Sequence, residues 1–275
     1  MRSQSEKIAL AECIKLFTGS YDVFSSAYSL KEEEVAALLN VNVDDFKEEY
    51  NKRVNDAAIY SSQLDFNYIK DSYFFTNGNL SILEKQKILI LGARRHSAQG
   101  KQEVLLQIKA IAANNAALVI SLEPGISLFA LSCAVKFNVP VIIVLANPFN
   151  MIKKEISSEI LAALPKDNIL FLSPFYMFEK VVAWNKIIRN RKLENISDKL
   201  IIAEELDGGP SWTSCDNFIQ EGKDVCVPNS LFSNPNSSFS KKLVDNGVIY
   251  TYKNEKEAFS FIKGSRRTKV TKSNK

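Results

Sequence analysis

Residues 87–100 read Lys-Ile-Leu-Ile-Leu-Gly-Ala-Arg-Arg-His-Ser-Ala-Gln-Gly, and this stretch decides the fold. The apolar run 88–91 is followed at once by Gly92, and a segment with helical spacing comes next. A continuous apolar run of this length predicts a strand that is buried on both faces, and the glycine predicts a sharp turn into a helix. We therefore expect a strand, a loop and a helix of the kind that opens a parallel α/β sheet.

The same pattern recurs along the chain. Segments with helical spacing, such as 101–113 and 128–137, separate further apolar runs, which are 117–120, 141–144, 169–172, 200–203 and 225–227. Such runs alternating with helices predict an α/β fold with a doubly wound, mostly parallel, Rossmann-like sheet. Ligands of these sheets bind beyond the carboxyl ends of the strands, so the loops there are the candidate sites.

The chain divides into three parts by composition. Apolar residues at helical spacing, for example Leu10, Cys13 and Phe17, predict a small helical domain over residues 1–65, with Ser29 as one helix cap. Residues 66–263 are expected to form the Rossmann-like domain, in which 66–78 is a connector. Residues 264–275 carry five cations and no acid, which predicts a basic disordered tail.

Bulk composition excludes several classes of protein. The 275 residues carry a net charge of +4, which permits a polyanionic partner without requiring one. The four cysteines lie far apart and His96 is the only histidine, so we expect no metal site and no cofactor. No apolar run has the length of a membrane span, and we expect a cytoplasmic protein.

The loop 92–100 is the first candidate site. A helix that starts directly after a strand offers free backbone N–H groups, which suit a phosphate. Gly92, Arg94 and Ser97 are therefore candidate phosphate-binding residues, with Arg94 expected to point inward and Arg95 outward. A Gly-x-Gly-x-x-Gly fingerprint is absent, which disfavours a dinucleotide. An ordinary turn with exposed arginines is the alternative.

The loop 207–213 is the second candidate site. Gly208 and Gly209 permit a nest of backbone N–H groups, and the hydroxyls of Ser211 and Thr213 can donate to phosphate oxygens. An ordinary tight turn with a serine cap explains the same residues equally well.

A basic segment at 184–192 is the third candidate. It places four cations and Trp184 within nine residues. Arginine suits bidentate contact to phosphate, and an aromatic ring can stack on a base. The alternative is a solvated basic face of a helix. The candidate binding residues here are Lys186, Arg189, Asn190 and Arg191.

In their order, these features resemble the DprA/Smf family of DNA-processing proteins. That family has a Gly-Ser-Arg loop followed by Ser and Gly, an Arg-Asn-Arg segment before a strand that ends in Glu, a Ser-Gly loop with a Thr, and Gly-Arg before a strand that ends in Pro. The corresponding residues here are Gly92-Ala93-Arg94 with Ser97 and Gly100, Arg189-Asn190-Arg191, Glu204, Gly208-Gly209 with Thr213, Gly222-Lys223 and Pro228.

The resemblance implies a particular function. Proteins of this family bind single-stranded DNA, form homodimers and help to place the RecA recombinase on DNA during transformation or recombination. They are not known as enzymes. We therefore expect a homodimer that binds single-stranded DNA and RecA, without catalytic residues, and whose affinity for DNA falls with salt.

One segment departs from the family pattern. The family's Gly-x-Ala-Arg-Gly-Ile-Asp is here 121–127, which lacks the Arg and Asp and carries Glu123. This departure favours a degenerate member that acts through protein contacts as one alternative. The other alternative is a Rossmann-like nucleotide-binding protein or nucleotide-sugar-bond hydrolase. Hydrolases of that group use a Pro-Gly-Gly-x-Gly-Thr-x-x-Glu loop, and Cys215 would stand where the loop has its catalytic carboxylate, which disfavours the reaction.

Overall fold

A computed structural model describes residues 2–233 and 238–264. Apart from Gly264, the tail expected at 264–275 lies outside the described residues. Within these ranges the strands form one sheet in the order β1-β2-β6-β5-β4-β3-β7-β8-β9. Strands β3 to β9 pair in parallel, and β1 and β2 add an antiparallel pair at the β6 edge. The strands are Asp65–Ile69 (β1), Ser72–Gly78 (β2), Lys87–Gly92 (β3), Ala117–Ile120 (β4), Val141–Val144 (β5), Ile169–Ser173 (β6), Lys199–Glu204 (β7), Asp224–Pro228 (β8) and Tyr250–Tyr252 (β9).

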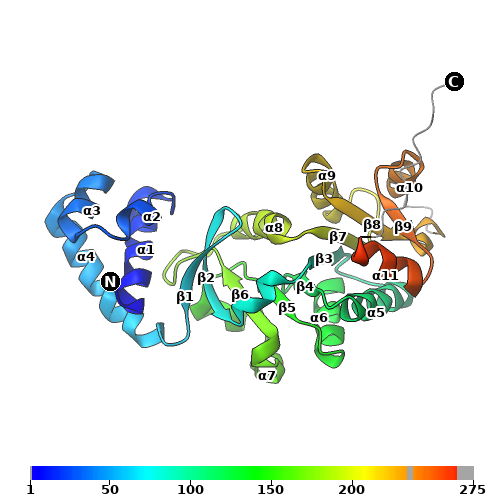
Figure 1. Ribbon diagram of the computed structural model, residues 1–275, viewed down its shortest axis with the longest axis horizontal. Helices are drawn as coiled ribbons and strands as arrows, with labels where there is room; N and C mark the ends of the chain where they lie inside the picture. Colours follow the sequence, from blue (N-terminus) through cyan, green and yellow to red (C-terminus); the bar gives the residue numbers. More distant parts are fainter. Residues whose placement is uncertain (1, 234–237, 265–275) are drawn as a thin grey trace.

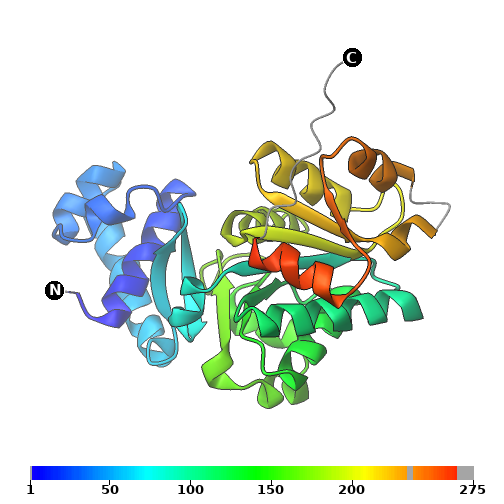
Figure 2. The same cartoon turned by 45° about the vertical axis from the view of Figure 1, so that its right-hand side comes forward.

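Helices cover both faces of the sheet, as Figures 1 and 2 show. Helices α5, α6 and α11 lie on one face, where Ile88 and Ile90 point, and α8, α9 and α10 lie on the other, where Leu89 points. Alternate side chains of β3 thus belong to two hydrophobic cores, one on each face of the sheet. The helices are α5 (Ala98–Ala113), α6 (Ile126–Lys136), α7 (Ser158–Ala163), α8 (Asn185–Ile196), α9 (Ser211–Gln220), α10 (Ser238–Asp245) and α11 (Glu255–Lys263).

The predicted fold class is therefore confirmed, and the six predicted strands are β3 to β8. From β3 the chain proceeds through β4 and β5 to β6 on one side, and then returns to place β7 on the other side of β3. The loops that follow β3 and β7 consequently diverge to opposite faces of the sheet. This switch point is where open α/β sheets bind their ligands.

The prediction of a connector at 66–78 is wrong, because this segment forms most of the β1–β2 hairpin. Phe66 and Phe75 pack against the N-terminal helices, whereas Phe74 packs into the core under α8. The turn residues Lys70 and Asp71 have φ values of 40° and 60° without a glycine, so the usual hairpin signal is missing from the sequence.

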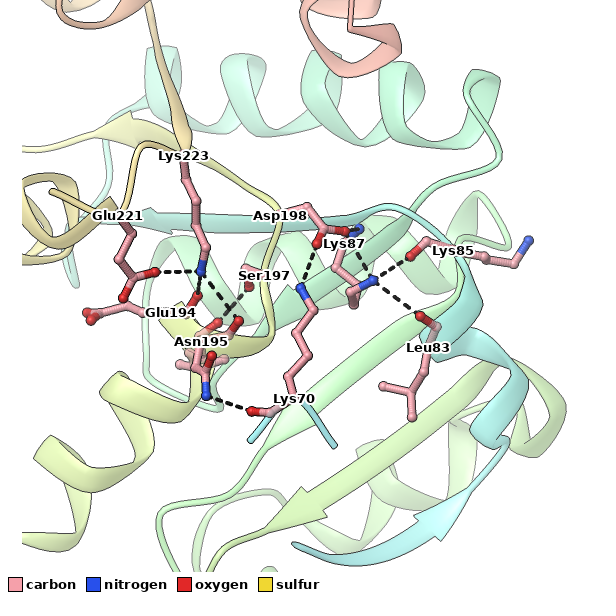
Figure 3. Close-up of polar contacts among 11 residues, drawn as sticks. Lys70, Leu83, Lys85, Lys87, Glu194, Asn195, Ser197, Asp198, Glu221 and Lys223 are labelled. Carbon is pink, nitrogen blue, oxygen red and sulfur yellow. Dashed lines mark hydrogen bonds and ion pairs between the residues drawn. The ribbon is translucent and has the colours of Figure 1, made fainter. Parts of the chain in front are cut away.

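The tip of the hairpin is held by contacts at the amino ends of β3 and β7, drawn in Figure 3. The Nζ of Lys70 lies 2.7 Å from a carboxylate oxygen of Asp198, and the same carboxylate is 3.1 Å from Nζ of Lys87. The amide of Asn195, near the end of α8, donates to the carbonyl of Lys70 at 2.8 Å. These contacts fix the hairpin beside α8.

The N-terminal helices pack against the outer side of the hairpin (Figure 1). They are α1 (Gln4–Thr18), α2 (Phe24–Ala27), α3 (Glu32–Leu39) and α4 (Val43–Tyr60). The expected cap at Ser29 is wrong, because α3 begins after Lys31, whose backbone N–H is capped by the Glu34 carboxylate. Among the described helices, none is both long and apolar enough to cross a membrane.

Candidate nucleic-acid interface

A pocket of about 140 Å³ opens at the carboxyl ends of β3 and β4, between their loops and helix α8. We call it the basic pocket. The structure brings together here residues from all three candidate segments. Six of the predicted site residues line it, and they are Gly92, Arg94, Lys186, Arg189, Asn190 and Ser211.

Two glycines allow the pocket's loops to approach each other. A Cβ atom on Gly92 would lie 2.8 Å from the Glu204 carbonyl oxygen and 2.8 Å from the Ile126 side chain. Gly125 has a φ of 92° and lies against the carbonyls of Ala93 and Arg94, so a side chain there would be strained and would clash. Close packing of these two loops places Arg94 beside the loop that carries Glu123.

Glu123 lies at the centre of the pocket's charges. Its carboxylate is 3.4 Å from Arg94, 3.2 Å from Lys186 and 3.3 Å from Arg189. Burial alone would raise the pKa of Glu123, but these three cations, led by Arg189, hold it below the ordinary value. The carboxylate is therefore ionised at neutral pH and neutralises part of the positive charge around it.

The three cations differ in how firmly they are held. The side chain of Arg189 is only 4% exposed, and its Nε donates to Asn190 Oδ1 at 2.9 Å. The side chains of Arg94 and Lys186 are 70% and 56% exposed. Arg189 is thus fixed in place, whereas the other two cations can turn toward a ligand at little cost.

The helix amino ends at the switch point already hold carboxylates of this chain. The backbone N–H of Ser97, at the start of α5, donates to Glu204 at 2.9 Å. The hydroxyl of Ser211, at the start of α9, donates to Glu205 at 2.6 Å, and its N–H donates to the same oxygen at 3.3 Å. These internal caps were not predicted, although the sequence has two adjacent acids, Glu204 and Glu205, directly after the apolar run of β7.

The remaining predicted residues lie outside the basic pocket. Ser97 caps α5 by accepting from the N–H of Gly100 at 3.0 Å. Gly208 and Thr213 are exposed on the β7–α9 connection and α9, and Gly209 packs over Glu205. Arg191 is exposed on α8 and lines no part of this pocket. Both arginines expected to point in opposite directions are exposed, Arg94 by 70%, but Arg94 lines the pocket and Arg95 does not.

Lys223, which stands where the resembling family has arginine, has a different position. Its Nζ donates at 2.8 Å to the carbonyl of Glu194 near the end of α8, and it pairs with Glu221 at 2.7 Å (Figure 3). A cation at the carboxyl end of a helix stabilises the helix dipole. Lys223 therefore acts on α8 from the end opposite to the basic pocket.

The fold and this site define a doubly wound α/β protein with a basic pocket at the switch point of its sheet. Residues 53–263 match the family described as DNA recombination-mediator protein A. The chain belongs to this family.

Individual relatives agree with this assignment. The DNA processing protein DprA of Bacillus subtilis is 28% identical over 202 residues, which cover 71% of this chain and 67% of that protein. Across the curated relatives that it matches, the chain spans between 52% and 67% of their length.

Two solved structures share the fold. DNA processing protein A from Streptococcus pneumoniae has a TM-score of 0.65 at 18% identity, over 94% of this chain and 93% of that one. DNA processing protein A from Helicobacter pylori, described for its mode of binding single-stranded DNA, has a TM-score of 0.63 at 18% identity, over 74% of this chain and 98% of that one.

Proposed function

We propose that the chain binds single-stranded DNA and that the basic pocket holds its phosphates. The observation that carries this proposal is the convergence of Arg94, Lys186 and Arg189 from two separate segments on one pocket, with Glu123 as the one acid among its lining residues. Among the lining residues, three positive charges and one negative charge leave a surplus of two, and Glu155, outside the lining, also acts on Arg189. A surplus of cations at the switch point suits a polyanion.

The three cations of the pocket would contact DNA in two different ways. Arg189 is buried and held by Asn190, so its guanidinium is already oriented when a phosphate arrives. Arg94 and Lys186 are exposed and can exchange their contact with Glu123 for a contact with DNA. Trp184, which is 66% exposed at the start of α8, offers a ring on which a base can stack.

The internal caps argue against the alternative of a nucleotide-binding enzyme. A Rossmann-type nucleotide places its phosphates at helix amino ends, and here Glu204 and Glu205 hold those of α5 and α9. Cys215, at the position where the hydrolase loop has its carboxylate, is fully buried, and burial raises its pKa to about 12. We therefore propose a binding protein without a catalytic site.

Family membership supports three further parts of the proposal. We propose that the chain forms a homodimer, that RecA is its protein partner on DNA, and that it works in the cytoplasm during transformation or recombination. The curated relatives support this role through the shared family.

The test uses two neighbouring arginines. Fluorescence anisotropy of a labelled oligothymidylate is measured with the wild type, Arg94→Ala and Arg95→Ala. The two substitutions remove the same charge from the same loop, but only Arg94 lines the basic pocket. We expect Arg94→Ala to weaken binding and Arg95→Ala to leave it nearly unchanged. Equal effects would locate binding elsewhere, and displacement of the oligonucleotide by a mononucleotide at similar concentration would favour the nucleotide-binding alternative.

A further inference from the structure

Helix α8 presents three faces along its length, and only one of them belongs to the basic pocket. Lys186, Arg189 and Asn190 line that pocket. Ile188 and Lys192 line a second cleft on another face. With 3.6 residues per turn, the face that carries Ile187 and Arg191 points between these two.

The face of α8 between the two clefts is solvent-exposed. Trp184 is 66% exposed and Ile187 is 41% exposed, and Arg191 is exposed as well. By helical spacing these three side chains lie on one side of α8. An aromatic ring, an aliphatic side chain and a cation thus form a strip that connects the basic pocket with the second cleft.

The second cleft has a volume of about 730 Å³ and lies between α8, the end of α1 and the β1–β2 hairpin. We call it the tyrosine cleft. In Figure 1 the hairpin stands between the N-terminal helices and α8, and the contact of Lys192 with Ser72 confirms that α8 and the hairpin adjoin. The residues used below are Lys15 and Tyr21 from the α1 side, Tyr68 and Tyr73 from the hairpin, and Lys192 from α8.

Two lysines of the tyrosine cleft lack an acidic partner at ion-pair distance among the described residues. The Nζ of Lys192 donates to the hydroxyl of Ser72 at 2.7 Å, and that of Lys15 donates to the carbonyl of Gly19 at 2.7 Å. Burial and the nearby Lys15 lower the pKa of Lys192, whereas Asp22 acts in the opposite direction. In the described part of the chain neither ammonium group is engaged in an ion pair, so each can contact a phosphate, although Asp22 and Asp71 among the lining residues balance their charge.

The cleft also offers a ring for stacking. The side chain of Tyr68 is 61% exposed, and its ring lies 4.8 Å from that of Tyr73. A nucleotide supplies both parts that such a cleft can bind, since its base stacks on a ring and its phosphate pairs with an ammonium. Asp22 and Asp71 line the cleft too, so its contribution to affinity is modest.

We propose that the tyrosine cleft is a second contact site for the same single strand of DNA, which leaves the basic pocket across the exposed strip of α8. In this arrangement Arg191 contacts the backbone on the strip, a base stacks on Tyr68, and a phosphate lies near Lys15 and Lys192. The inference rests on the proposed function.

The geometry selects a single strand over a duplex. An α-helix with its side chains is about 10–12 Å across, so a DNA strand that contacts both clefts bends sharply over that distance. Duplex DNA has a persistence length of about 500 Å and resists such a bend, whereas a single strand does not. The second site therefore adds preference for single strands as well as affinity.

The test compares two lengths of oligothymidylate, about 4 and about 20 nucleotides, which fill one site or both. Affinities are measured for Tyr68→Ser, Tyr68→Phe and Lys192→Gln, with Lys109→Gln, at an exposed position of α5, as the control. We expect Tyr68→Ser and Lys192→Gln each to weaken binding of the long oligonucleotide about fivefold, the lower range for one base stack or phosphate contact, and to leave the short one unchanged. Tyr68→Phe keeps the ring and should bind like the wild type.

The outcomes separate this inference from the proposed function. If Tyr68→Ser and Lys192→Gln both bind the long oligonucleotide like the wild type while Arg94→Ala weakens binding, the tyrosine cleft is not a DNA site. The proposal for the basic pocket is then retained. Equal weakening of the short and long oligonucleotides also overturns the inference, because the variants would then act on the basic pocket. Failure of the wild type to bind either length overturns both. Because Tyr68 is largely exposed, Tyr68→Ser tests the idea even if Lys192→Gln disturbs the hairpin.

Discussion

Replacing Glu123 with glutamine should strengthen DNA binding while weakening the fold. The change keeps the shape of the side chain and removes the one negative charge among the residues that line the basic pocket. A phosphate that contacts Arg189 would lie roughly 5 Å from the Glu123 carboxylate, and Coulomb's law then gives a repulsion of about 1 kcal/mol at the dielectric constant of water and about 3 kcal/mol at an effective value near 20. Arg94 and Lys186 are exposed, which favours the lower figure, so we expect about fivefold tighter binding at low salt.

The same substitution should make binding more sensitive to salt. Glu123 now neutralises one cation of the pocket, and its removal frees that cation for DNA. The slope of log affinity against log salt should steepen by about 0.7, the value for one more phosphate contact on a single strand. Anisotropy with an oligothymidylate over a salt series measures both quantities. Weaker binding by Glu123→Gln would refute this reasoning and would mean that Glu123 orients Arg189 for DNA.

Stability should change in the opposite direction. Arg189 is almost fully buried, and without Glu123 it loses its ion-pair partner, although Glu155 still acts on it from a greater distance. We expect the free energy of unfolding, measured in urea, to fall by about 1 kcal/mol, because the amide oxygen of glutamine can still accept from Arg189 but the bond loses the contribution of the carboxylate charge.

The pH dependence follows from the lowered pKa of Glu123, in which the three cations outweigh the effect of burial. The stabilisation by ionised Glu123 is present above the unfolded-state pKa and is lost as pH falls through the folded-state pKa. DNA affinity of the wild type should rise over that same acid range, and the wild type and Glu123→Gln should converge there. A constant difference between them down to the lowest pH at which the protein is folded would contradict this account.

Three further predictions concern other parts of the structure. Ser97→Ala should lower the free energy of unfolding by about 1 kcal/mol, because Ser97 caps α5, and should leave DNA affinity unchanged. Reduced affinity would mean that Ser97 contacts DNA. Asp198→Asn should cost up to about 1 kcal/mol at neutral pH, because Lys70 and Lys87 outweigh burial and lower the pKa of Asp198. The difference in free energy of unfolding between Asp198→Asn and the wild type, measured in urea, should vanish as pH falls through the lowered pKa of Asp198. A difference that persists at lower pH would contradict this prediction. Cys215 should react with a thiol reagent at neutral pH only as fast as the chain opens, because burial raises its pKa to about 12, and rapid labelling would argue against the packing of α9.

The apolar runs were sufficient to predict strands β3 to β8 of the sheet, but not β1, β2 and β9. Their residues are buried on both faces, so the runs are continuously apolar, and their shortness and β-branched content indicate strands rather than helices. The β1–β2 hairpin was missed because Lys70 and Asp71 make a turn without glycine, which contacts from Asp198 and Asn195 hold in place. Such long-range support leaves no local signal in the sequence.

The candidate site was predicted in part for a similar reason. Arg94 and Arg189 stand near the ends of the right elements, so topology alone brings them together. The serines and glycines were harder to assign, because the same residues serve to cap a helix or to bind a phosphate. Only the structure shows that Glu204 and Glu205 already occupy the helix ends where Ser97 and Ser211 were expected to meet DNA.

The central claim is that the basic pocket binds single-stranded DNA through its surplus of cations, and the salt dependence of binding by the wild type and Arg189→Met tests it most directly. Two or three phosphate contacts predict a slope of log affinity against log salt of about −1.4 to −2.1 for the pocket, and any contact in the tyrosine cleft would add to it. Arg189→Met should reduce the magnitude of that slope by about 0.7 in a chain that still folds. Binding that is absent at low salt, or that has the same slope in both proteins, would contradict the claim.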